Sequence, residues 1–135
     1  MRKFTRLVIK GEFTDLNKYI NYERMNKFIA SSIKKNETER VYWECISQGL
    51  KKQTKKIFIV FKWYLANKKK DKDNIAFAKK FILDGLVMAK VLKNDGFDSI
   101  EGFLDLFYLS PDNPRVEVEL LDSFSEIKYL LTNKK

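Results

Sequence analysis

The run KIFIVFKWYLA (residues 56–66) constrains the fold more than any other part of the sequence. Its apolar side chains fall on both faces of an extended chain, which is typical of a strand in the interior of a sheet. Three further segments alternate well enough to be predicted as strands, at residues 4–10, 99–109 and 115–121. A sheet therefore forms the centre of the predicted fold.

Two predicted helices separate these strands. The first runs over residues 14–48, has Thr14 or Asp15 available as its cap, and contains a polar stretch near Asn36 that is a candidate for a break. The second covers residues 73–93 and is followed by turn residues. The order β-α-β-α-β-β predicts an α+β fold in which helices pack on a mixed sheet.

The length of 135 residues and the hydrophobic content of 44% predict one domain, residues 1–135, with a packed core. Within it, SEIKYLLT (residues 125–132) is predicted to form a short closing helix. No apolar run approaches the roughly 20 residues needed to span a bilayer. The single Cys45 cannot form an internal disulfide, so we expect a cytoplasmic protein in which Cys45 is a core residue.

The chain is strongly basic and contains no histidine. Its 27 Lys and Arg against 18 Asp and Glu give a formal charge of +9, which indicates a polyanionic partner, nucleic acid first and an anionic membrane second. A basic protein without such a partner is the alternative. The lack of histidine excludes Ser-His and Cys-His nucleophilic sites and zinc sites that need imidazole. Catalysis then depends on lysines and carboxylates, and oxygen ligands favour Mg²⁺ or Mn²⁺.

The segment KKKDKDN (residues 68–74) places two carboxylates among lysines, between the central strand and the second helix. Asp71 and Asp73 are two residues apart, so in an extended chain they point the same way and can hold a divalent cation. Helix capping is the alternative role for Asp73, but it explains only one of the two acids. Asp95 lies in the turn after the same helix, and a return of the chain there is expected to bring it near the pair.

The second predicted helix has two different faces. One is an apolar stripe expected to lie on the sheet, formed by Ile75, Ala78, Ile82, Leu86 and Ala89. The opposite face carries Asp73, Lys80 and Asp84. That combination suggests a site or an interface, and the alternative for the last two residues is an ordinary (i, i+4) ion pair.

These motifs resemble those of the RusA-type Holliday junction resolvases, which are small and often phage-encoded endonucleases. The resemblance rests on KDKDNIAFAKKFILDGLV, VLKNDGF and NPRVEVEL and covers residues 56–120; over the first helix the sequence looks like the longer version in phages of Gram-positive bacteria. It implies a Mg²⁺-dependent homodimer that nicks a four-way DNA junction on two opposing strands. It implies no small-molecule cofactor.

The resemblance also implies roles for single residues. Asp71, Asp73 and Asp95 are the metal ligands, and Lys80 is the catalytic lysine. Lys79 is its rival, because compact members of the family carry their lysine about one helical turn nearer to the D-x-D-N motif. The closing turn departs from the family pattern, which often has two adjacent aspartates there, whereas this chain has ND.

Basic residues around the acids and along the first helix are expected to contact DNA phosphates, and the alternative for each group is a solvated face. The candidates are Arg24, Lys27, Lys34, Lys68, Lys69 and Lys70. The homodimer interface is expected on the second helix, at Phe77, Phe81 and Met88.

Two other functions compete with a nuclease. One is a non-catalytic basic DNA-binding protein of phage origin with the same fold. The other is a membrane-surface protein, which fits the charge but leaves the acids unexplained. Metal-dependent nicking of a four-way junction separates the nuclease from the DNA-binding protein.

Overall fold

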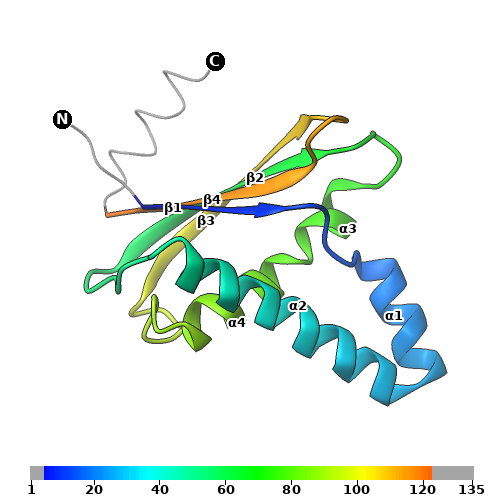
Figure 1. The fold of residues 1–135 in the computed structure, drawn as a ribbon, viewed down its shortest axis with the longest axis horizontal. Coiled ribbons are helices and arrows are strands. Elements are labelled where there is room, and N and C mark those ends of the chain that lie inside the picture. The colour runs from blue at the N-terminus through cyan, green and yellow to red at the C-terminus, as the bar shows by residue number, and fades with distance from the viewer. Residues whose placement is uncertain (1–4, 123–135) are drawn as a thin grey trace.

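The computed structural model describes residues 5–122, which form a four-stranded sheet with helices on one face (Figure 1). The strands are β1 (Thr5–Lys10), β2 (Ile57–Leu65), β3 (Ile100–Leu109) and β4 (Arg115–Leu121). The helices are α1 (Leu16–Met25), α2 (Lys27–Ser47), α3 (Lys72–Ala76) and α4 (Lys79–Met88). The predicted α+β class and mixed sheet are confirmed, while the predicted closing helix at 125–132 lies outside the described residues.

Strand β2 lies inside the sheet, as its apolar run predicts. The strand order is β1-β4-β2-β3, and β2 is antiparallel to β4 and parallel to β3. Ile57 pairs with Ile100 where β2 and β3 begin, and Leu65 pairs with Leu109 where they end. β3 is therefore an edge strand of the described sheet, and the β3–β4 connection crosses the end of β2 instead of forming a hairpin.

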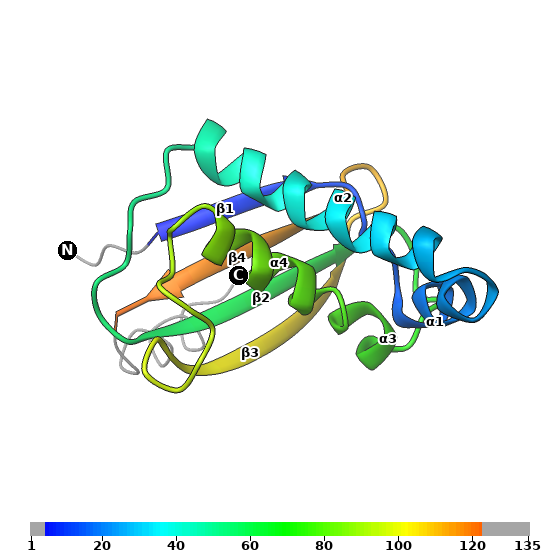
Figure 2. The same ribbon diagram turned by 90° about the horizontal axis from the view of Figure 1, so that it is seen from below.

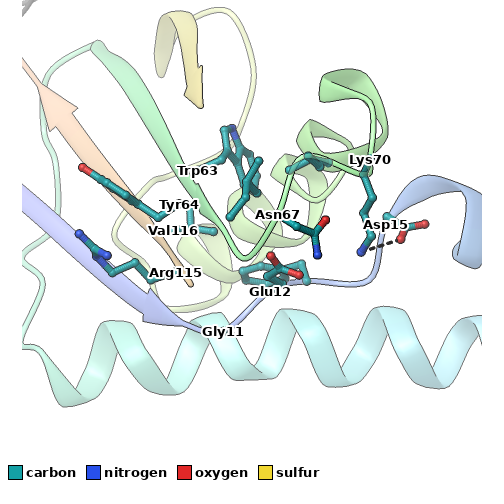
Figure 3. Close-up of a pocket in the computed structure, with 12 residues that line it drawn as sticks. Gly11, Glu12, Asp15, Trp63, Tyr64, Asn67, Lys70, Arg115 and Val116 are labelled. Carbon is teal, nitrogen blue, oxygen red and sulfur yellow. Dashed lines mark ion pairs between the residues drawn. The ribbon is translucent and has the colours of Figure 1, made fainter. Parts of the chain in front are cut away.

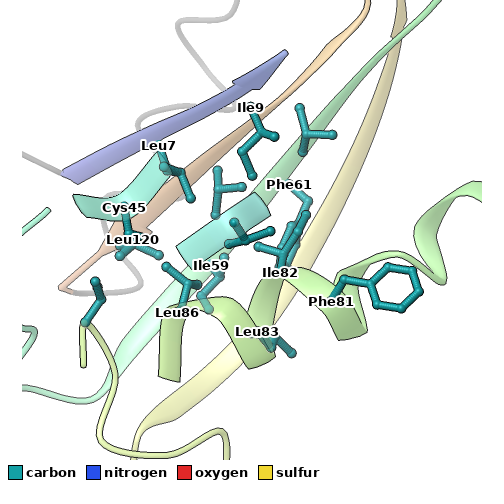
Figure 4. Close-up of a cluster of buried hydrophobic side chains, with 14 of the residues drawn as sticks. Leu7, Ile9, Cys45, Ile59, Phe61, Phe81, Ile82, Leu83, Leu86 and Leu120 are labelled. Atoms are coloured by element: carbon teal, nitrogen blue, oxygen red, sulfur yellow. The ribbon is translucent and has the colours of Figure 1, made fainter. Parts of the chain in front are cut away.

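Helices α2 and α4 cover one face of this sheet and bury its core (Figures 2 and 4). The core includes Leu7, Ile9, Ile59, Phe61, Ile82, Leu86 and Leu120. The stripe predicted to face the sheet does so, since its three central residues are buried and its two outer ones pack at the margin of the core. Cys45 is also a core residue, and burial, aided by Glu44, raises the pKa of its thiol to about 12.

The two covering helices approach most closely at Gly85. A Cβ atom there would lie 2.4 Å from the Cβ of Val41 and 3.0 Å from the carbonyl oxygen of Thr38. Non-bonded carbon atoms attract best at about 3.5–4 Å, so any side chain at this position would force the helices apart. The glycine therefore sets the spacing of the helical layer.

The first helical segment breaks at Asn26, so the prediction of a break near Asn36 is wrong. α1 ends at Met25 and α2 begins at Lys27. Asn26 has an extended backbone (φ −165°, ψ 117°), and its side-chain oxygen accepts a hydrogen bond from the Phe28 N–H at 2.8 Å. Because Asn26 caps a new helix, α1 and α2 form a helical hairpin whose tip is residues 25–29.

The second helical segment also consists of two helices. α3 and α4 are separated by Phe77 and Ala78, and α4 ends at Met88, before the predicted end. Lys90 has φ 62°, a left-handed conformation that does not continue a helix. Asp73 therefore lies on a different helix from Lys80 and Asp84, and the predicted single face is wrong.

Phe77 and Phe81 do not form a free surface on α4. Phe81 is only 1% exposed, and its ring centroid lies 6.4 Å from that of Phe13 and 6.0 Å from that of Tyr19. The ring of Phe77 lies 5.4 Å from that of Tyr19. Phe13 of the β1–α1 loop and Tyr19 of α1 therefore pack against these rings. The prediction that Phe77 and Phe81 form a dimer interface is therefore wrong, and only Met88 of that group is exposed.

Candidate functional site

Asp71 and Asp73 lie at the end of the sheet where β2 and β3 finish. Asp71 is the N-cap residue of α3 (φ −71°, ψ 152°), but its side chain makes no capping hydrogen bond. Asp73 lies in the first turn and accepts a hydrogen bond from the Asn74 N–H at 2.9 Å. Both side chains are exposed, and neither forms an ion pair within residues 5–122. The cap position thus belongs to Asp71, and the extended chain predicted through both acids is wrong, because α3 begins at Lys72. Both carboxylates, called the acid pair below, are open to solvent.

Polar contacts tie the acid pair to the start of α1. The Asn74 side-chain oxygen accepts a hydrogen bond from the Asn17 N–H at 2.9 Å, and Lys70 pairs with Asp15 at 3.0 Å. Asp15 also caps α1 by accepting from the Lys18 N–H at 2.9 Å. Burial alone raises the pKa of the Asp15 carboxyl, but the hydrogen bond from Lys18 and the charge of Lys70 outweigh it, so this pKa falls below 3.8.

A groove of ≈ 330 Å³ lies beside the acid pair, at the end of β3. Its lining includes Lys68, Lys70, Lys72, Phe107 and Tyr108. The Lys72 ammonium lies 5.7 Å from the centroid of the Phe107 ring, which is within cation–π range. Lysines interleaved with aromatic rings are suited to a nucleic-acid strand, because the cations attract phosphates and the rings stack on bases.

A second cavity, of ≈ 130 Å³, lies between the β1–α1 loop and the end of β2 (Figure 3). Glu12, Lys70 and Arg115 line it together with Trp63. The Glu12 carboxylate accepts a hydrogen bond from the Ala66 N–H at 2.9 Å and so ties the loop to the end of β2. Lys70 lines both this cavity and the groove.

The two candidate lysines of α4 have different surroundings. The Lys80 side chain is 56% exposed, and its ammonium lies 3.6 Å from Asp84, an ordinary (i, i+4) pair. Lys79 forms an ion pair with Asp105, and its ammonium lies 5.5 Å from the ring centroid of Phe61. Lys79 is therefore fixed over the sheet, whereas Lys80 faces solvent.

Asp105 is a candidate that the sequence analysis missed. Besides pairing with Lys79, its carboxylate accepts a hydrogen bond from the Trp63 indole N–H at 2.9 Å. Phe107 follows two residues later on the same face of β3 and lines the groove. The available signal was the sequence itself, because Asp105 is the one charged residue in the otherwise apolar stretch 102–109.

Asp95 lies in the loop between α4 and β3. Figure 2 shows that this loop is at the opposite end of the sheet from α3. The acid pair follows the end of β2, Asp95 precedes the start of β3, and the two strands are parallel. A strand of this length spans roughly 30 Å, so the return of the chain does not bring Asp95 to Asp71 and Asp73. Among residues 5–122 no three carboxylate or thiol groups are placed to hold one metal ion. A metal-ligand role for Asp95 stays a prediction, but Asp95 does not lie near Asp71 and Asp73 of the same chain.

The basic residues predicted to contact DNA along the first helix lie on two helices. Arg24 lies in the last turn of α1, Lys27 in the first turn of α2, and Lys34 farther along α2. All three are exposed, as is Lys69 beside the acid pair. The break at Asn26 thus places Arg24 and Lys27 on either side of the hairpin tip.

No protein-family model matches the chain, and no curated protein matches it. Over the part of the chain that the structure describes, no helix is both long and apolar enough to cross a membrane. The site must therefore be interpreted from its own residues.

Proposed function

We propose that the protein is a Mg²⁺-dependent endonuclease that resolves four-way DNA junctions by paired, symmetric nicks. The observation that carries this proposal is the acid pair, since both carboxylates are solvent-open and unpaired within residues 5–122 although lysines surround them. Neighbouring carboxylates repel one another unless a cation lies between them. The lysine-lined groove beside the pair supports an anionic substrate.

The residues present fit such a metal. Asp71 and Asp73 offer the oxygen ligands that Mg²⁺ and Mn²⁺ prefer, and no ion pair competes for either carboxylate in the described chain. A bound metal supplies an activated water and neutralises charge on the phosphodiester. Lys68 and Lys69 attract the DNA backbone toward carboxylates that would otherwise repel it.

A lysine near the acid pair stabilises the negative charge that develops during cleavage. The family resemblance implies Lys80, but the contacts favour Lys79, because Asp105 and Phe61 already fix its position over the sheet. Lys79→Ala and Lys80→Ala separate the two. Replacing the catalytic lysine lowers turnover far more than affinity, since one phosphate contact is a small part of DNA binding.

The proposal includes a symmetric homodimer, because two nicks need two sites and each chain has one acid pair. We assign the interface to the edge strand β3, where Phe103 and Leu109 are exposed. Antiparallel pairing of two β3 strands about a two-fold axis places the start of one beside the end of the other. Asp95 of the second copy then lies toward Asp71 and Asp73 of the first.

Mixing two inactive variants tests this shared site. Asp73→Asn and Asp95→Asn each remove one ligand, and in a mixed dimer one shared site carries both substitutions while the other carries neither. We expect mixing to restore single nicks without paired nicks. A site built within one chain gives no recovery, and light scattering on each sample verifies that dimers form.

The nuclease itself is tested on a labelled four-way junction with and without Mg²⁺. We expect cleavage only with the metal. Asp73→Asn should abolish cleavage and preserve or tighten junction binding, because it removes a ligand and a charge that repels phosphate. Glu39→Gln is the control, an acid on α2 outside the pair, and should cleave normally. An Asp73→Asn protein that cuts at the wild-type rate removes Asp73 from the metal site.

A non-catalytic DNA-binding protein is the second candidate. It is favoured by one observation, that residues 5–122 of a single chain bring no third acid to the pair. The same assay decides, because this protein binds the junction and leaves it intact with Mg²⁺ and with Mn²⁺.

A further inference from the structure

The tip of the α1–α2 hairpin exposes large apolar side chains that the core does not use. Met25 is 74% exposed, Phe28 85% and Ile29 38%, all within five residues of the chain. The hairpin extends beyond the sheet (Figures 1 and 2), so its tip lies away from the sheet. Contiguous exposed apolar groups of this size mark an interaction surface in folded proteins.

Hydrogen bonds in the turn hold the backbone of Phe28, whose ring is exposed. The Asn26 side-chain oxygen accepts from the Phe28 N–H at 2.8 Å, and the Asn26 N–H donates to the Tyr22 carbonyl at 2.8 Å. The backbone that carries the ring is thus bonded to both helices of the hairpin. A backbone that is already ordered lowers the entropic cost of binding through the ring that it carries.

Charge around the tip selects the partner. Residues 18–35 contain five Lys or Arg and one Glu, a net charge of +4. Arg24 and Lys27 flank the apolar group and are exposed. Two copies of such a tip repel one another, whereas a polyanion is attracted. Apolar side chains flanked by cations are what proteins insert between the bases of bent or branched DNA.

We propose that the tip is a wedge that stacks Phe28 on a base at the branch point of the DNA. This inference rests on the proposed function, and it also specifies a distance. α1 is about 15 Å long and its start is bonded to Asn74, beside Asp73, so tip and acid pair contact DNA about four base pairs apart.

The test uses a four-way junction with 2-aminopurine at the branch point, in EDTA so that no cleavage occurs. Wild-type protein should raise the fluorescence as the base unstacks. Phe28→Ala should abolish this rise and weaken binding by about 5- to 150-fold, the range for loss of one base–aromatic stack. Phe28→Trp should retain both. Trp43→Ala is the matched control, because Trp43 is 62% exposed on the same helix but far from the tip, and it should behave as wild type.

Each other outcome identifies a different surface. A Phe28→Ala protein with normal fluorescence and affinity overturns the wedge. A Phe28→Ala protein that loses binding to anionic phosphatidylserine vesicles but binds the junction normally also overturns the wedge, and the partner is then a membrane. A Phe28→Ala protein whose mass in light scattering differs from wild type overturns it too, and the partner is then a second copy of the chain. A protein that shows the Phe28-dependent rise but never cleaves with Mg²⁺ keeps the wedge and loses the proposed nuclease. Thermal unfolding verifies that Phe28→Ala is folded.

Discussion

Helices α1 and α4 have the same length, ten residues, yet they use their apolar side chains in opposite ways. Five residues of α4 are buried, whereas none of α1 is. α4 is positioned by the core. α1 is positioned by the packing of Tyr19 on Phe77 and Phe81 and by polar contacts through Asp15 and Asn74. α4 therefore stabilises the fold, whereas α1 and the hairpin tip that follows it can present side chains to a partner.

The largest expected effect tests the stabilising side of this comparison. Phe81→Ala should lower the free energy of unfolding by about 3–5 kcal/mol, because it removes a buried ring and leaves a cavity. Phe28→Ala, the same substitution at the hairpin tip, should change it by less than about 0.5 kcal/mol. Urea unfolding of both variants measures the difference. Equal losses would mean that the hairpin tip is also packed.

The core elements could be predicted from the sequence because their apolar residues are periodic. An apolar run on both faces predicts an interior strand, and β2 is one; the stripe around Ile82 predicts the face of α4 that meets the sheet. Periodicity failed for Phe81 because it describes one layer of contacts. Phe13 of the β1–α1 loop and Tyr19 of α1 pack against the Phe81 ring, and no pattern within the helix predicts those contacts.

The site was predicted less completely because it depends on strand direction. Asp71 and Asp73 are close in the chain and therefore stay near one another, but α3 begins at Lys72, so they are not arranged as in an extended strand. The position of Asp95 depends on whether β3 is parallel or antiparallel to β2, and the observed parallel pairing sends it to the far end. The helix break at Asn26 was not predicted, for a related reason. An asparagine within a helical pattern becomes a cap only where the chain turns, and its own neighbours do not determine that.

A smaller effect is expected where α1 is anchored. Asp15→Ala should cost about 0.5–2 kcal/mol at pH 7, because it removes the cap of α1 and the ion pair with Lys70. Asp15→Asn is the control, since asparagine can still cap and only the charge is lost.

The same anchor should depend on pH. The folded-state pKa of Asp15 is lowered, so its charge contributes stability above pH 4 or so, and that contribution is lost as pH falls through the lowered value. The gap in unfolding free energy between wild type and Asp15→Asn should therefore narrow on acidification, as urea unfolding at several pH values measures. A gap that widens toward low pH would show that the Lys70 contact does not stabilise the carboxylate.

Replacing the two cations beside the hairpin tip should have the smallest effect on stability and a clear effect on DNA binding. Arg24 and Lys27 are exposed, so replacing both with Ala should change the free energy of unfolding by less than about 0.5 kcal/mol. If both contact phosphates, the slope of log affinity against log salt should become shallower by about one to two units. Lys51→Ala with Lys52→Ala removes the same charge near the start of β2, away from the acid pair, and should leave the slope closer to wild type. Equal slopes for the two double variants would show that DNA responds to the net charge alone, and the hairpin would then have no particular place in the interface.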